Sequence, residues 1–120
     1  MTRLVVSSAV GVLLVLLSWA PTLAQDRAKL ERRGKLLLES NCSACHAVGR
    51  TGASPHRTAP PFRTLGQNYA IESLAEALAE GLSTGHPDMP EFVFETPEVS
   101  AILTYLQSIQ VPRTTDNRNR

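Results

Sequence analysis

Two cysteines and a histidine stand together in this sequence as Cys42-Ser43-Ala44-Cys45-His46. This is the C-x-x-C-H pattern of covalent haem attachment. Two thiols three positions apart can add to the two vinyl groups of one porphyrin, and the adjacent His46 can then give an imidazole nitrogen to the iron. The chain has no other cysteine that could pair with either thiol. The motif therefore predicts one covalently bound haem c.

Three other interpretations of the cysteines are weaker. A structural zinc site needs four ligands, which Cys42, Cys45, His46 and either His56 or His86 could supply by number. A thioredoxin-like C-x-x-C expects a βαβ context, but no stretch of this sequence shows sustained strand alternation. A disulfide between the two cysteines would close too small a loop to stabilise much.

The opposite face of a haem iron needs a second ligand or a vacancy. If the N-terminal leader is removed, the one methionine left is Met89, within Gly85-His86-Pro87-Asp88-Met89-Pro90. Two prolines and a glycine predict a stiff loop, and a methionine is unusual as core filler in such a polar turn. His86 and His56 are the competing candidates. We expect His46 and Met89 to be the axial ligands, which would raise the potential of the iron and leave no open site for oxygen.

The first 24 residues resemble a secretory signal. They have a basic start at Arg3, an apolar run over 4–17, and small residues that predict cleavage near Ala24. The run is interrupted by two serines and a glycine, whereas a spanning helix needs about 20 apolar residues, so a retained membrane anchor is the weaker alternative. The expected organisation is a signal peptide at 1–24, one domain at 25–112 and a polar, disordered tail at 113–120.

The charge of the mature chain argues against nucleic acid as a partner. Removal of residues 1–24 from a chain of 120 leaves 96, and the loss of Arg3 leaves 11 basic and 11 acidic residues. Such a neutral chain is a poor candidate for binding a polyanion. A domain of this size has a small apolar core and benefits from an additional group that stabilises the fold. The apolar faces of a haem would serve this purpose.

Helical periodicity predicts three helices and an all-α domain. The first spans about 26–40 with Asp26 as N-cap, the second about 70–80 with Gly81 as its stop, and the third begins with Thr96 as N-cap and is stopped by Pro112. The region 47–69, rich in glycine and proline, is expected to be a loop with a short helical turn. The second helix carries glutamates at i, i+4 spacing, which we interpret as a solvated face: Glu72, Glu76 and Glu80.

Over about residues 26–111 the chain resembles the class I cytochromes c, a monohaem type of the bacterial periplasm. Cys42, Cys45 and His46 match the family's attachment motif, and Met89 before Pro90 matches its axial methionine loop. The resemblance implies a small cytochrome c fold, with three main helices and loops wrapped around one haem c. It also implies an electron carrier rather than an enzyme.

The resemblance extends to helix packing and to the shell around the proximal histidine. Gly34 and Tyr105 match positions where the family's first and last helices cross in close contact, whereas Leu38 stands where the family often has an aromatic residue. Ala59-Pro60-Pro61-Phe62 resembles the family's Gly-Pro-x-Leu segment. This implies that the Pro60 carbonyl accepts the second ring N–H of His46.

We therefore expect a periplasmic monomer that passes single electrons between redox proteins through transient docking. A membrane is expected as a partner only if the leader is kept. The alternatives are a haem c subunit of a larger oxidoreductase, and a haem enzyme or sensor with an open sixth site.

Overall fold

The computed structural model describes residues 20–81 and 86–112, and all the regular elements in that part of the chain are helical. They are the α-helices α2 (Ala20–Cys42), α3 (Leu74–Glu80) and α4 (Thr96–Ile109), with the 3₁₀ helices η1 (Phe62–Gln67) and η2 (Ile71–Ser73). The predicted all-α fold class is confirmed. Most of the predicted signal peptide and the predicted tail lie outside the described residues, so both stay predictions.

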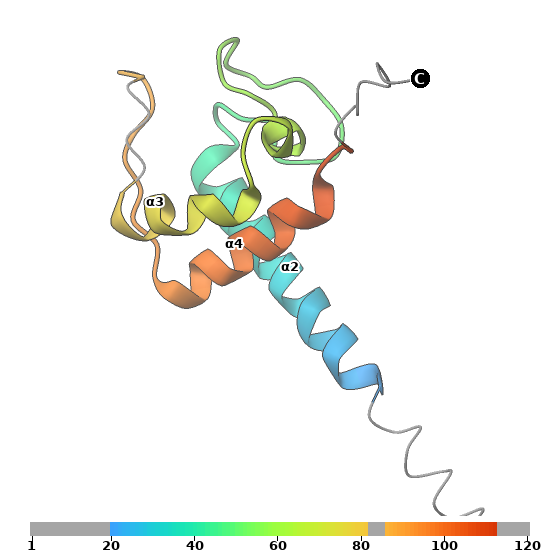
Figure 1. Ribbon diagram of the computed structural model, residues 1–120. Helices are drawn as coiled ribbons and strands as arrows, with labels where there is room; N and C mark the ends of the chain where they lie inside the picture. The colour runs from blue at the N-terminus through green and yellow to red at the C-terminus, as the bar shows by residue number, and fades with distance from the viewer. Residues whose placement is uncertain (1–19, 82–85, 113–120) are drawn as a thin grey trace, which may run out of the picture.

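Helices α2 and α4 cross at the centre of the molecule, and the N-terminal part of α2 projects beyond the crossing (Figure 1). Gly34 lies at this crossing. A β-carbon added there would collide with the carbonyl oxygen of Ala101 and would lie 2.9 Å from Cβ of Tyr105. Glycine lets the two backbones touch, which confirms the predicted close contact and explains why a poor helix former stands inside α2.

The apolar core forms around α4, where Ala101 and Ile102 have no exposed surface. Leu38 of α2 fills the position beside the crossing and is 2% exposed. The hydroxyl of Tyr105 donates a hydrogen bond of 3.1 Å to the carbonyl of Val48, which begins the loop after α2. That bond ties the long loop to the helix crossing.

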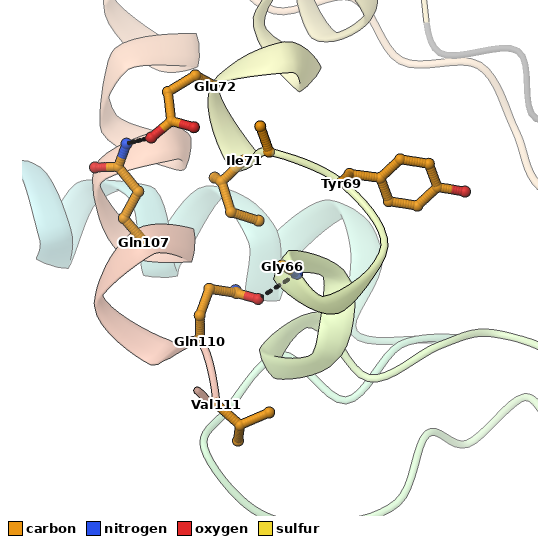
Figure 2. Close-up of a pocket in the computed structure, with 8 residues that line it drawn as sticks. Gly66, Tyr69, Ile71, Glu72, Gln107, Gln110 and Val111 are labelled. Atoms are coloured by element: carbon orange, nitrogen blue, oxygen red, sulfur yellow. Dashed lines mark hydrogen bonds between the residues drawn. The ribbon is translucent and has the colours of Figure 1, made fainter. Parts of the chain in front are cut away.

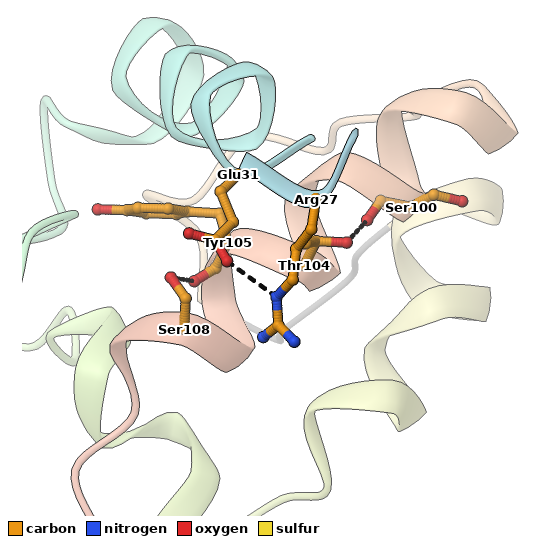
Figure 3. A network of polar contacts seen from close by, with 6 residues as sticks. All are labelled: Arg27, Glu31, Ser100, Thr104, Tyr105 and Ser108. Atoms are coloured by element: carbon orange, nitrogen blue, oxygen red, sulfur yellow. Dashed lines mark hydrogen bonds and ion pairs between the residues drawn. The ribbon is translucent and has the colours of Figure 1, made fainter. Parts of the chain in front are cut away.

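The polar side chains near the crossing bond mostly within their own helix (Figure 3). On α2, Arg27 pairs with Glu31 at 3.1 Å. On α4, the Thr104 hydroxyl donates to the Ser100 carbonyl at 2.7 Å. Exposed pairs of this kind contribute little to stability, so the crossing depends on apolar packing.

The predicted helix over 70–80 is divided into η2 and α3, which meet at Leu74. The three glutamates Glu72, Glu76 and Glu80 are exposed, as their interpretation as a solvated face requires. Gly81 ends α3 with a φ of 114°, a conformation that favours glycine. The amide of Phe94 donates to the Leu78 carbonyl at 2.9 Å and holds the segment after Met89 against α3.

Both predicted N-caps are wrong. Helix α2 begins at Ala20, so Asp26 lies inside it and the helix passes through the predicted cleavage point at Ala24. The N-cap of α4 is Glu95, not Thr96, because the Glu98 carboxylate accepts the Glu95 amide at 3.2 Å in a capping box.

The helix η1 is held to the end of α4 by the side chain of Gln110 (Figure 2). Its Oε1 accepts the amide of Gly66 at 2.7 Å, and its Nε2 donates to the carbonyls of Phe62 and Leu106. Beside it, Gln107 donates to the Glu72 carboxylate at 2.8 Å. These bonds fix the end of the long loop that carries Pro60.

Candidate functional site

The cysteine motif lies where α2 ends and the chain turns back. Cys42 is the last residue of α2, and its carbonyl accepts the amides of Cys45 at 3.1 Å and His46 at 2.9 Å. Asn41 and Ser43 donate from their side chains to the carbonyls of Leu37 and Glu39. The bonds to the carbonyls of Glu39 and Cys42 satisfy groups left over at the helix end, and the turn presents two thiols and an imidazole together.

Both cysteines are free thiols and half-buried. Burial, and secondly the charge of Cys45, raise the pKa of Cys42 to about 11. A thiol in such surroundings stays protonated near neutral pH, which is the opposite of the lowered pKa that redox-active C-x-x-C pairs use. The absence of a strand from the described residues removes the βαβ context as well. The structure therefore argues against the thioredoxin-like alternative.

The ring of His46 is fixed from two sides. Its Nδ1 lies 2.8 Å from the carbonyl oxygen of Pro60, and its ring stacks on Phe62 with centroids 4.5 Å apart and an interplanar angle of 27°. A carbonyl oxygen can only accept, so this hydrogen bond places a proton on Nδ1. The other nitrogen, Nε2, then carries the lone pair that a metal ion requires.

The loop that supplies Pro60 is itself bonded to the turn. The Phe62 amide donates to the Ala47 carbonyl at 3.0 Å, and the Ala47 amide donates to the Ser54 hydroxyl at 3.0 Å. His56 adds a third connection, because its amide donates to the Cys45 carbonyl at 3.1 Å. The loop therefore folds back onto the motif and holds the imidazole.

Met89 is half-buried in a turn whose neighbours Asp88 and Pro90 are exposed. The turn is closed by a hydrogen bond of 3.1 Å from the Met89 amide to the His86 carbonyl. Asp88 lies 3.8 Å from Nε2 of His56, so this turn reaches the loop that is bonded to Cys45. The structure brings His46 and Pro60 into contact, and it connects the turn of Met89 to the same loop through His56.

The zinc interpretation finds no support in this arrangement. All five of its candidate ligands lie in the described part of the chain, which holds no cluster of three or more His, Cys, Asp or Glu side chains suited to a metal ion. A four-ligand site built from Cys42, Cys45 and His46 with either other histidine is therefore not formed.

The residues that are present fit a c-type haem. Two free, half-buried thiols stand at the required spacing. In the adjacent His46, Nδ1 is hydrogen-bonded to the Pro60 carbonyl, which leaves Nε2 for iron. The stacked Phe62 ring adds an apolar surface beside that imidazole.

The family model described as cytochrome c matches residues 31–110. The chain therefore belongs to the cytochrome c family, and the cytochrome c fold follows from this match and from the helical architecture. The family implies a haem c electron carrier. No curated protein and no solved structure matches the chain at a significant level.

Sequence reasoning missed two contributors to the site. The sequence offers His56 only as a candidate ligand to zinc or to the haem iron, whereas in the structure its backbone is bonded to the motif and its ring faces Asp88. Gln110 was not singled out, although it fixes the carbonyl of Phe62. Neither partner is near in the sequence, so no local pattern could have indicated these contacts.

Proposed function

We propose that this protein is a periplasmic electron carrier with one haem c bound to Cys42 and Cys45 and ligated by His46 and Met89. The observation that carries the proposal is the 2.8 Å contact between Nδ1 of His46 and the Pro60 carbonyl. It sets the tautomer in which Nε2 is free to bind iron, and it increases the basicity of that nitrogen. The haem supplies the redox chemistry, a one-electron exchange between Fe(III) and Fe(II).

The polypeptide positions the groups that would hold the haem and forms their surroundings. Pro60 and Phe62 fix the imidazole plane, the turn at the end of α2 fixes the thiols, and the Met89 turn presents a thioether. A thioether ligand favours the ferrous state and raises the potential. With both axial positions filled, the protein passes electrons to transient partners through a small interface and performs no substrate chemistry itself.

The periplasmic location is supported by the leader-like sequence at 1–24. Among the described residues, no helix is both long enough and apolar enough to cross a membrane. N-terminal sequencing of the exported protein tests this part of the proposal. A mature chain that begins near Gln25 supports it, whereas a chain that still begins at Met1 contradicts cleavage.

The axial ligand is tested by the optical spectrum of the ferric protein. We expect the weak near-red band of methionine sulfur on ferric iron in the wild type, its loss in Met89→Ala, and its retention in the control His86→Ala. Retention in Met89→Ala, or loss in the control alone, contradicts Met89 as ligand.

Free shuttle and complex subunit are separated by purification in mild buffer. A shuttle elutes alone, as a monomer. A stoichiometric partner that stays bound would favour the haem subunit of a larger oxidoreductase.

A further inference from the structure

His56 connects the two halves of the proposed haem site, through its backbone on one side and its ring on the other. On one side, its amide donates to the Cys45 carbonyl at 3.1 Å, and its own carbonyl accepts the Ala59 amide at 3.2 Å. On the other side, its Nε2 lies 3.8 Å from Oδ2 of Asp88. Asp88 immediately precedes Met89 in the sequence. One residue therefore touches both the attachment motif and the turn of the proposed second ligand.

The orientation of the His56 ring is set by Thr58. Nδ1 lies 3.4 Å from the Thr58 amide and 3.0 Å from the Thr58 hydroxyl. The amide can only donate, so Nδ1 of the neutral ring accepts and the proton lies on Nε2, which faces Asp88. In the protonated ring, Nδ1–H can donate to the hydroxyl instead, and Nε2–H still faces the carboxylate. In both forms Nε2–H faces Asp88, and the protonated ring forms an ion pair with its carboxylate.

The Met89 turn is anchored to α3 on its C-terminal side. The amide of Phe94 is bonded to Leu78, and Glu91 lies against Gly81, which fixes the chain beyond Pro90 to α3. Within the turn, the Met89 amide is bonded to His86. The His56–Asp88 pair joins this turn to the loop that begins at the cysteine motif.

From this juxtaposition we infer that His56 and Asp88 are positioning residues that hold Met89 toward the iron. The inference rests on the proposed function, because it requires Met89 to be a ligand. Neither side chain touches the iron; the pair acts by limiting how far the turn moves away. If the turn moved away, the Met89 thioether would leave the iron as a neutral ligand that keeps its electron pair, and an external ligand such as imidazole could bind in its place.

The expected effect is small because the pair is exposed. The side chain of Asp88 is 79% exposed and that of His56 is 40% exposed. Exposed pairs of this kind change an equilibrium by about two- to fivefold. Their loss should therefore raise the affinity of an external ligand for the ferric iron by that factor.

The experiment titrates the ferric holoprotein with imidazole at one fixed pH for all variants. The dissociation constant is read from the loss of the near-red band in wild type, Asp88→Asn, His56→Gln and the double variant. Glu76→Gln is the matched control, because it removes an equal charge from an exposed glutamate on α3. We expect each single variant to bind imidazole about two- to fivefold more tightly, the double variant to add no more, and the control to match the wild type.

Unchanged imidazole affinity in both single variants overturns the inference, and so do effects that simply add in the double variant. A merely structural role would lower the melting temperature without changing the imidazole affinity, which also overturns it. A wild type that lacks the near-red band refutes methionine ligation itself. Failure of the proposed function and failure of this inference alone are thereby distinguished.

Discussion

Replacement of Gly34 by alanine tests how the two long helices meet. The added β-carbon would lie 2.5 Å from the carbonyl carbon of Ala101 and 2.9 Å from Cβ of Tyr105, and it would overlap the Ala101 oxygen. Two of these three atoms belong to the α4 backbone, so no side-chain rotation can relieve the collision. The helices must move apart.

The size of the effect follows from two opposing terms. Alanine in place of glycine inside a helix stabilises that helix by about 1 kcal/mol. Separation of the helices loosens the packing of Ala101 and Ile102, which are fully buried, and lengthens the 3.1 Å bond from Tyr105 to Val48. Overpacking of this kind costs about 1–3 kcal/mol and more when backbone must move, and a lost hydrogen bond adds about 1 kcal/mol. The net expectation is a loss of about 1–3 kcal/mol in the free energy of unfolding.

The assay is urea unfolding of the holoprotein, followed by far-UV circular dichroism. The matched control is Gly49→Ala, whose added β-carbon would come no closer than 4.0 Å to the Thr51 oxygen. We expect the control to differ from the wild type by less than about 1 kcal/mol. Gly34→Ala with wild-type stability would refute the close backbone contact.

Three further predictions concern the elements around the site. Gln110→Ala removes three hydrogen bonds between α4 and η1 or within α4, so the free energy of unfolding should fall by about 1–3 kcal/mol. Equal unfolding midpoints for variant and wild type would contradict this. Glu98→Ala breaks the capping box of α4 and should cost about 1 kcal/mol in urea unfolding, whereas Glu98→Gln should recover most of it because the amide oxygen still accepts; an equal loss in both would contradict the cap. Phe62→Ala removes a buried ring stacked on the His46 imidazole and should lower the free energy of unfolding by about 3–5 kcal/mol. Phe62→Leu should lower it clearly less, because leucine fills most of the space. Equal melting temperatures for the two variants would contradict packing as the cause.

The sequence predicted the all-α fold and the close contact at Gly34 better than the boundaries of the helices. Cys42, Cys45 and His46 are adjacent, so their geometry is set by one local turn that the motif itself encodes. Gly34 was predictable as a contact point because a glycine inside a helix requires a reason. These features depend on residues that are close together in the sequence, so a sequence pattern can predict them.

Three features escaped prediction, and each has its own physical reason. Thr96 before Pro97 is a favourable N-cap pattern, but the Glu98 carboxylate reaches the Glu95 amide and shifts the helix start. Asp26 lies inside α2 because the helix extends back to Ala20, so Asp26 does not stand at a helix start. The pairing of His56 with Asp88 joins two loops, and loop contacts carry no periodic signal.

The central claim is the covalent attachment of one haem to Cys42 and Cys45. The test is the intact mass of the purified protein, combined with alkylation of its thiols under denaturing conditions. We predict the mass of the mature chain plus one haem, with neither cysteine alkylated. A mass without haem, or two cysteines that alkylate, would contradict the account.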